Sequence, residues 1–265
     1  MSFKLLFPTY LARYRWVERT LASRTGGTSV RRLLHLGTGE GDYDPMLARF
    51  AEEVHAIDIN PDDVAFARSR NAMVEGLRYS VQDGHALEFD DATFDAVVSV
   101  DVLEHVADPP RMLRELARVL RPGGFAVITV PNVDFPWTYD PLHRALSPDK
   151  RLAGVGAYAY GHDKLIGERQ MRAWLASAGL EVEPAARITF ALAASLECYW
   201  PGILQRVLKA NATNDGRAPA RRVAIKPRSH RVPALARVTE ALNELDARIA
   251  GPHAPSVGIA FVARR

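Results

Sequence analysis

The strongest fold signal in the sequence is the stretch LLHLGTGEGD at residues 33–42. A short strand-like run ends here at alternating glycines, and a helix-like segment follows them. Glycine permits positive φ and lets the backbone approach a ligand closely, so the stretch predicts a cofactor-binding turn. A dinucleotide site would have glycine at position 42, beneath the pyrophosphate. Asp42 stands there instead, and because its charge would repel pyrophosphate, we expect a different cofactor.

Two aspartates follow the next two strand-like runs, which lie at 54–59 and 77–81. Asp58 closes the first run, and Asp83 comes shortly after the second. Since the carboxyl ends of parallel strands share one edge of a sheet, both side chains are expected beside the glycines. Asp58 there can accept from ribose hydroxyls, and Asp83 from an adenine amino group. The alternative for each is a solvated aspartate in a turn.

Strands and helices alternate along much of the chain. The strand-like runs lie at 32–36, 54–59, 77–81, 96–100, 125–130 and 180–182, and helix-like segments at 42–50, 110–120 and 168–178 separate several of them. Asn60 and Pro61 are typical of a helix start, and RPGG at 121–124 predicts a turn before the fifth run. The alternation predicts an α/β fold with a mainly parallel sheet and helices on both faces.

Composition excludes several classes of protein. The chain has 265 residues, 48% hydrophobic content and a net charge of +3, which is typical of a globular protein and gives no reason to expect nucleic acid. The single cysteine, Cys198, excludes an internal disulfide and fits a reducing compartment. Because the sequence has neither a long apolar run nor an apolar signal-peptide block, we expect a cytoplasmic protein.

We expect a single domain over residues 1–265 with two additions. Residues 1–25 predict an amphipathic helix, interrupted near Pro8, that serves as a lid. Residues 188–255 predict a helical, basic insertion before a last strand. Its apolar and basic part, 188–237, predicts contact with an anionic membrane at its periphery, and the alternative is that it packs on its own domain.

Residues 33–180 resemble the class I S-adenosylmethionine-dependent methyltransferases. The resemblance is carried by LLHLGTGEGD, AIDINP, VQDG, FDAVVSVDVLEHVADP, LRELARVLRPGGFAVITVPN and YGHDKLIGERQMRAWLASAGLEV. It implies a Rossmann-like, seven-stranded, mainly parallel sheet whose last strand is antiparallel. It also implies S-adenosylmethionine as the cofactor. The YGHD segment is further similar to the GTHD segment of ubiquinone-biosynthesis O-methyltransferases.

The resemblance also implies the residues that bind the cofactor. They are Gly37, Gly39, Gly41, Asp58, Ile59, Asp83, Gly84 and Asp101. The three glycines would border the methionine part, and Asp58 would hold the ribose. Ile59 would pack on the adenine, whose amino group Asp83 and Gly84 would hold. The family usually has an acid at position 35, and this sequence has His35.

Catalytic candidates follow the fourth strand and precede a later helix. Methyl transfer needs alignment of the acceptor and, for a hydroxyl, removal of a proton. Glu104, His105 and His162 are the candidates for this role, and the alternative for Glu104 and His105 is a structural one. The same residues with Asp101 could bind a divalent metal, which we expect less, so the metal ligands stay unassigned.

The expected function is therefore methylation of a small hydroxylated molecule, most readily the O-methylation of a quinone-like, lipid or secondary-metabolite acceptor. RNA 2'-O-methylation is one alternative, although residues 205–237 lack the interleaved aromatics that stack on bases. Another is a non-catalytic, cofactor-binding protein, which His35 supports. The sequence indicates neither the acceptor nor an oligomeric state.

Overall fold

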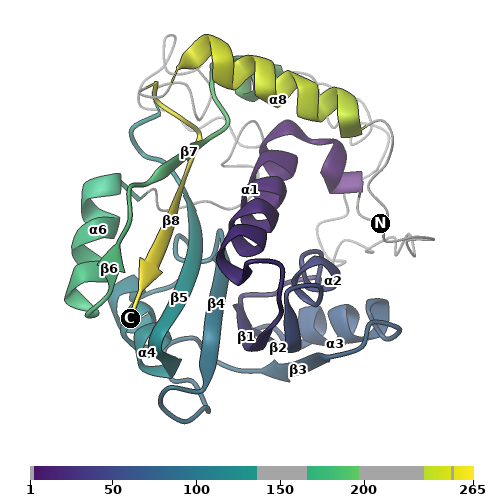
Figure 1. Cartoon of the computed structure of the whole chain (residues 1–265), viewed down its shortest axis with the longest axis vertical. Coiled ribbons are helices and arrows are strands. Elements are labelled where there is room, and N and C mark those ends of the chain that lie inside the picture. The colour runs from purple at the N-terminus through teal and green to yellow at the C-terminus, as the bar shows by residue number, and fades with distance from the viewer. Residues whose placement is uncertain (1–2, 136–165, 197–235, 252–253) are drawn as a thin grey trace, which may run out of the picture.

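The computed structural model describes residues 3–135, 166–196, 236–251 and 254–265, and its elements form one sheet with helices around it (Figure 1). The strands are β1 (Val30–Leu36), β2 (Ala51–Asp58), β3 (Leu77–Val81), β4 (Phe94–Val100), β5 (Leu120–Pro131), β6 (Glu181–Val182), β7 (Ala186–Ile188) and β8 (Gly258–Arg264). The helices are η1 (Phe3–Leu6), α1 (Pro8–Thr25), α2 (Asp44–Leu47), α3 (Pro61–Arg70), α4 (Pro109–Val119), α6 (Glu168–Ser177) and α8 (Ala236–Ala250), of which η1 is a short 3-10 helix.

The sheet confirms the predicted fold class. Its strand order is β3-β2-β1-β4-β5-β8-β6, and the pairs among β1 to β5 are all parallel. The last strand, β8, is antiparallel and lies between β5 and β6. The short strand β7 also pairs with β8, so the sheet has 8 strands in place of the expected seven. Strand order reverses beside β1 and β4, where α/β sheets bind their ligands.

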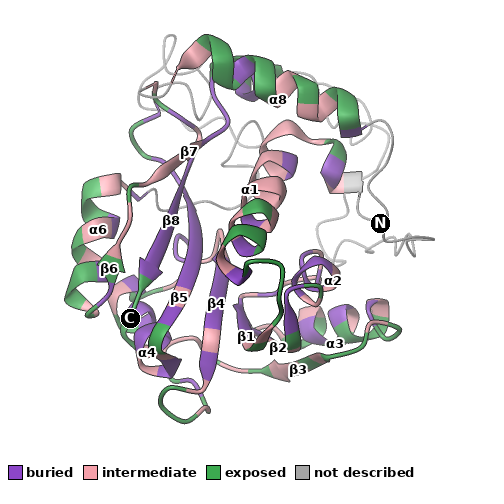
Figure 2. Cartoon of the chain, viewed as in Figure 1, coloured by how far each residue is buried: buried purple, intermediate pink, exposed green. Residues whose placement is uncertain are grey.

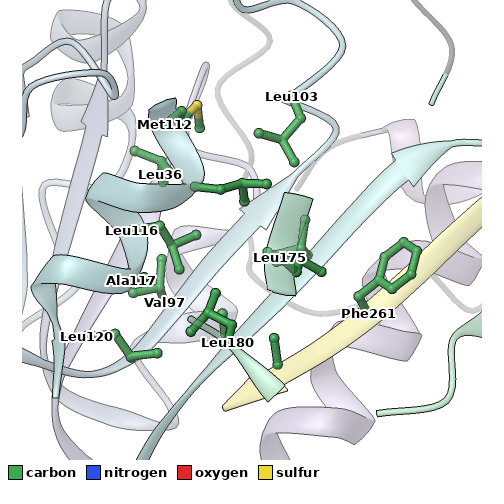
Figure 3. Close-up of a cluster of buried hydrophobic side chains, with 14 of the residues drawn as sticks. Leu36, Val97, Leu103, Met112, Leu116, Ala117, Leu120, Leu175, Leu180 and Phe261 are labelled. Carbon is green, nitrogen blue, oxygen red and sulfur yellow. The ribbon is translucent and has the colours of Figure 1, made fainter. Parts of the chain in front are cut away.

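Side chains alternate between two cores, one on each face of the sheet. On β1, Leu34 and Leu36 join the core beneath α4 and α6, whereas Leu33 joins the core beneath α1 and α2. Figure 2 shows the buried strands and the exposed outer faces of the helices, and Figure 3 shows Leu116 and Leu175 packed against the first core. Because successive residues of a strand point to opposite faces, a nearly continuous apolar run serves both cores.

The start of α3 confirms the sequence signal at Asn60. The Asn60 side chain accepts a hydrogen bond of 3.0 Å from the backbone N–H of Asp62, and Pro61 occupies the first helical position. An asparagine cap satisfies an otherwise unpaired helix N–H, and proline lacks the N–H that the first turn leaves unpaired. These two residues fix where the chain turns from β2 into the helix.

The sequence predicted a turn at 121–124 that ends before the fifth strand, and this prediction is wrong, because β5 begins at Leu120 and includes these residues. Leu120 pairs with Phe94, and Phe125 pairs with Ala96, so the intervening residues bulge out of the strand opposite Asp95. The bulge is held by an ion pair between Arg121 and Asp95. Glycines in a strand are often the sign of such a bulge.

The predicted helix at 42–50 is also too long. The structure contains only the single turn α2, and β2 begins at Ala51, earlier than the expected start at residue 54. Residues 48–50 form a turn instead, and the backbone oxygen of Phe50 accepts a hydrogen bond of 2.9 Å from the N–H of Val30 on β1. The chain is therefore bonded to the sheet from Phe50 onward, and the helix ends before that residue.

The predicted N-terminal helix and its break at Pro8 are confirmed, since η1 ends at Leu6 and α1 begins at Pro8. The helix α1 packs beside α8, and Figure 1 shows α8 across the end of the molecule where α1 begins. Asn243 on α8 donates a hydrogen bond of 3.0 Å to the backbone oxygen of Pro8, and Arg15 forms an ion pair of 2.9 Å with Glu240.

Of the predicted insertion 188–255, the structure describes a helical segment at 191–196 and α8, whereas 197–235 lie outside the described residues. Asp246 of α8 is buried and accepts hydrogen bonds from the backbone N–H groups of Phe190, Leu192 and Ala193. The described parts of the insertion are thus joined to each other. No helix in the described part of the chain is long and apolar enough to cross a membrane.

Candidate active site

The glycine turn after β1 has the positive φ values that its glycines permit. Gly37, Gly39 and Gly41 have φ values of 80°, 52° and 74°. A Cβ atom on Gly37 would clash with the side chain of Val102, and one on Gly41 would lie 2.8 Å from the Cβ of Ala67. A Cβ on Gly39 would meet no atom of the described residues within 4 Å. Two glycines therefore allow the turn to pack, whereas Gly39 faces open space where a ligand can approach.

Asp58 lies at the end of β2 and contacts this turn. Its Oδ2 accepts a hydrogen bond of 2.8 Å from the backbone N–H of Gly39, and its Oδ1 accepts one of 3.0 Å from that of Asn60. A carboxylate has about four acceptor positions, so room is left for two further donors such as ribose hydroxyls. The next residue, Ile59, is 67% exposed and provides an apolar surface beside them.

Asp83 comes shortly after β3, which is the neighbour of β2 in the sheet. The last residue of β3, Val81, pairs with Asp58. Its carboxylate accepts hydrogen bonds from the backbone N–H of His85 at 2.9 Å and from the ring Nδ1 at 2.7 Å. The backbone bond and then the ring bond hold the pKa of Asp83 below its ordinary value. The backbone N–H of Asp108 donates to His85 Nε2 at 3.3 Å, so the ring proton lies on Nδ1 and points at Asp83.

Gly84 is the adjacent residue, and its small size has a visible reason. A Cβ atom there would lie 3.3 Å from Met112 Sδ and 3.4 Å from Leu36 Cδ1. The chain after β3 thus runs close to the core beneath α4. The predicted positions 83 and 84 lie at the same sheet edge as Asp58, next to it in strand order.

Asp101 lies after β4 in an unusual backbone conformation. Its φ is 52°, in the left-handed region that residues other than glycine seldom adopt. Its Oδ1 accepts a hydrogen bond of 2.8 Å from Thr129 on β5, and its Oδ2 forms an ion pair with Arg13 of α1. Strain of this kind is often retained at functional sites, and here it aims a carboxylate at the N-terminal helix.

The two described catalytic candidates lie in different environments. Glu104 is buried, and burial raises its pKa well above the ordinary value, with the negative charge of Asp101 as a further cause. The side chain of His105 is 43% exposed, and its Nε2 lies 4.0 Å from Glu104 Oε1. His162 lies outside the described residues. The structure therefore brings Glu104 close to Asp101 but leaves His105 on the surface beside them.

The metal alternative finds no support among the described residues. Within residues 3–135, 166–196, 236–251 and 254–265, no three acidic, histidine or cysteine side chains gather as a metal site. Asp101 instead faces the cation of Arg13 and the hydroxyl of Thr129. A carboxylate engaged in this way is poorly placed as a metal ligand, so the described donor set does not fit a divalent ion.

A tyrosine cluster between α1 and the residue before α2 was not among the predicted site residues. Tyr43 is buried, and its ring centroid lies 5.6 Å from that of Tyr10 and 5.3 Å from that of Tyr14. The hydroxyls of Tyr10 and Tyr43 are buried without a hydrogen-bond partner in the described part of the chain. Burial raises the pKa of both, so each keeps its proton and can donate to a ligand. The helical spacing of Tyr10 and Tyr14 is the signal that could have pointed to them.

The N-terminal segment also holds the outer side of the glycine turn. Lys4 Nζ forms ion pairs with Glu40 at 3.1 Å and with Asp42 at 2.7 Å. Arg70 of α3 approaches Asp42 from the other side at 2.5 Å. Burial by itself would lower the pKa of Lys4, but the two carboxylates raise it above its ordinary value. Charged contacts thus join η1 to the turn that the sequence singled out.

The environment of Glu104 predicts how stability depends on pH. The folded protein holds the Glu104 proton more tightly than the unfolded chain does, so this group's contribution is full below its ordinary pKa of 4.5 and is lost as pH rises through the folded value. Glu104→Gln removes that loss. We expect the melting temperature of the variant, relative to that of the parent, to increase between pH 5 and pH 9 in thermal melts.

Glu115→Gln is the matched control for this experiment. Hydrogen bonds from Arg118 lower the pKa of Glu115, so its contribution is present above the ordinary value and is lost in acid. Its replacement should lower the melting temperature by a nearly constant amount between pH 5 and pH 9. A Glu104→Gln difference that is equally flat with pH would contradict the assignment of a raised pKa.

Comparison with known proteins agrees with this geometry. The methyltransferase domain family matches residues 34–128. A probable S-adenosylmethionine-dependent methyltransferase of Mycobacterium tuberculosis is 36% identical over 123 residues, which cover 46% of this chain and 43% of that protein. A ubiquinone biosynthesis O-methyltransferase of Xanthomonas axonopodis pv. citri is 32% identical over 162 residues, covering 60% of this chain and 66% of that protein.

Similarity of structure extends over more of the chain. The crystal structure of the [4+2]-cyclase SpnF matches with a TM-score of 0.60 and 22% identity, covering 94% of this chain and 79% of that one. A phosphoethanolamine N-methyltransferase of Haemonchus contortus, in complex with S-adenosyl-L-methionine, matches with a TM-score of 0.56 and 18% identity, covering 97% of this chain and 57% of that one. These matches show the fold. The sequence matches show a methyltransferase domain at residues 34–128, similar to that of S-adenosylmethionine-dependent methyltransferases.

Proposed function

We propose that this protein transfers a methyl group from S-adenosylmethionine to the hydroxyl group of a small acceptor. The observation that carries the proposal is the open space at Gly39, whose N–H is fixed by Asp58 at the end of the neighbouring strand. The ubiquinone biosynthesis O-methyltransferases, at 28% to 32% identity, support an oxygen acceptor of the quinone-like, lipid or secondary-metabolite kind.

The residues at this sheet edge fit such a cofactor. Two acceptor positions of Asp58 suit the ribose hydroxyls, the exposed Ile59 suits an adenine face, and Asp83 suits its amino group. The glycine turn would border the methionine part. When bound, S-adenosylmethionine supplies a methyl group on a positively charged sulfur. The carboxylate of Asp101 follows β4 at the same edge of the sheet.

The chain's own contribution is alignment and proton removal. A methyl transfer is an in-line displacement, so holding the acceptor in line is the larger effect, and a hydroxyl must also lose its proton. Burial raises the pKa of Glu104 well above its ordinary value and so favours its protonated form, which suits it less to accept a proton. The side chain of His105 is 43% exposed beside Glu104, and histidine is the side chain that most often acts as a general base, so we propose it as the base. His162 stays a prediction for the same role.

The test measures turnover and binding together. Purified protein is incubated with S-adenosylmethionine and a panel of phenols, quinols, lipids, sugars and a structured RNA, with and without EDTA. We expect turnover of a hydroxylated small molecule, unaffected by EDTA and only weakly dependent on salt. Turnover of the RNA alone, falling steeply with salt, would favour the RNA alternative. Calorimetric binding of the cofactor without any turnover would favour the non-catalytic alternative.

A further inference from the structure

A buried carboxylate contacts the glycine turn and has no role in the proposed methyl transfer. Asp44, at the start of α2, is 0% exposed. Its Oδ1 lies 2.6 Å from His35 Nδ1 and accepts a hydrogen bond of 2.9 Å from Thr38 Oγ1. Its Oδ2 lies 2.8 Å from the same hydroxyl and accepts a hydrogen bond of 2.7 Å from the Tyr79 hydroxyl. Three side chains from different parts of the chain therefore converge on this one group.

The contacts continue from Tyr79 to the far end of the turn. Asn71 Nδ2 donates to the Tyr79 hydroxyl at 2.9 Å and to the backbone oxygen of Gly41 at 2.8 Å. Burial, and then the charge of Asp44, raises the pKa of Tyr79, so its hydroxyl keeps the proton that it donates. Asp44 thus holds the turn at Thr38 directly and at Gly41 through Tyr79 and Asn71. Gly39 lies between these two points, and Asp58 holds it from the other side.

The geometry requires a carboxylate at position 44. The ring nitrogen of His35 and the hydroxyls of Thr38 and Tyr79 are all donors toward Asp44. An asparagine has a single acceptor oxygen and would turn its NH₂ group toward at least one of these donors. A buried donor left without an acceptor is costly, and the turn would shift to relieve it. His35, where the family resemblance expects an acid, here serves as a donor to an acid nine positions later.

We propose that Asp44 is a positioning residue that sets the glycine turn, residues 37–41, for the methionine part of S-adenosylmethionine. This inference rests on the proposed function. It also explains why this chain can have His35 where the family resemblance expects an acid. The buried acid at the turn is supplied by Asp44 on α2, and His35 binds it. In this arrangement His35 helps to hold the turn in place, so its presence does not indicate that the cofactor site has been lost.

Two ligands separate positioning from general stability. S-adenosylhomocysteine has both the nucleoside and the amino-acid part, whereas 5'-methylthioadenosine has the nucleoside but lacks the amino-acid part. We expect Asp44→Asn to weaken binding of the first about tenfold, and binding of the second by less than about twofold, in calorimetry well below the melting temperature. Tyr79→Phe removes the hydrogen bond to Asp44 and so separates Asp44 from Asn71 and Gly41, while the contacts of Asp44 with His35 and Thr38 remain. It should show the same preference with a smaller change, which keeps the test available if Asp44→Asn does not fold.

The matched control is Asp246→Asn. Asp246 is also a buried carboxylate with several N–H donors, but it caps residues 190–196 and lies outside the turn. It should lower the melting temperature without changing the ratio of the two affinities. Equal losses of both ligands in Asp44→Asn, or the same change of ratio in Asp246→Asn, would overturn the inference and leave the proposed function standing. A parent protein that binds neither ligand would overturn both.

Discussion

Asp58→Ala is expected to weaken the binding of S-adenosylmethionine about a hundredfold. The carboxylate orders the turn through the N–H of Gly39 and orders the chain after β2 through the N–H of Asn60. Under the proposed function, it also accepts from the ribose. A hydrogen bond to a charged group contributes about 1.5 to 3 kcal/mol, so the loss of two of them from the bound state accounts for a change of this size. Calorimetric titration of parent and variant measures it.

Asp62→Ala is the control for the Asp58 variant. Asp62 is an exposed carboxylate only a few residues later in the chain, at the first turn of α3. It should leave the affinity unchanged within about twofold, because exposed charges contribute little. If Asp58→Ala binds the cofactor as tightly as Asp62→Ala does, Asp58 is not part of a ribose site and the proposed orientation of the cofactor is wrong.

Gly41→Ala should destabilise the fold by about 3 kcal/mol. The new methyl group would lie 2.8 Å from the Cβ of Ala67, which is fixed on α3, and 2.9 Å from Asp44 Oδ2. Overpacking of this kind costs about 1 to 3 kcal/mol, and the positive φ of Gly41 costs about 1 kcal/mol more for a residue with a side chain. Chemical denaturation of parent and variant gives the difference in the free energy of unfolding.

Gly26→Ala separates the two causes in this prediction. Gly26 follows α1 with a φ of 60°, and a Cβ atom there would meet nothing within 4 Å. Only the backbone cost applies, so we expect a loss of about 1 kcal/mol. Equal losses in the two variants would mean that the contacts of Gly41 with Ala67 and Asp44 carry no packing energy.

The sequence predicted those parts of the fold that local chemistry determines. Asn60 and Pro61 mark a helix start wherever they occur before a helical stretch, and the structure has that start. The bulge at 121–124 could not be predicted in the same way, because RPGG is as suitable for a turn as for a bulge. Strand pairing decides between a turn and a bulge, because both Leu120 and Phe125 pair with residues of β4.

In the site, too, the residues set by local sequence were predictable and those set by contacts between distant segments were not. Gly39 and Asp58 were predictable because both close neighbouring strands, and the structure joins them by a hydrogen bond. The contacts of Arg13 and Tyr10 were not, because the N-terminal helix must first fold back over the sheet before Arg13 can pair with Asp101 and Tyr10 can lie against Tyr43. Asp44 was missed for a further reason: its role depends on His35, and a single sequence does not show that a donor and an acid have been combined across α2.

The position of β8 has a consequence for how the protein is made. This strand lies between β5 and β6 but comes after every other described strand in the chain. As a ribosome releases the nascent chain, β1 to β5 can assemble early, while β5 keeps one edge without its antiparallel neighbour until β8 emerges. An uncovered edge of this kind is a template for aggregation, and pairing over such a long separation is slow. Chaperone demand during synthesis should therefore concentrate on the interval between the appearance of β5 and that of β8.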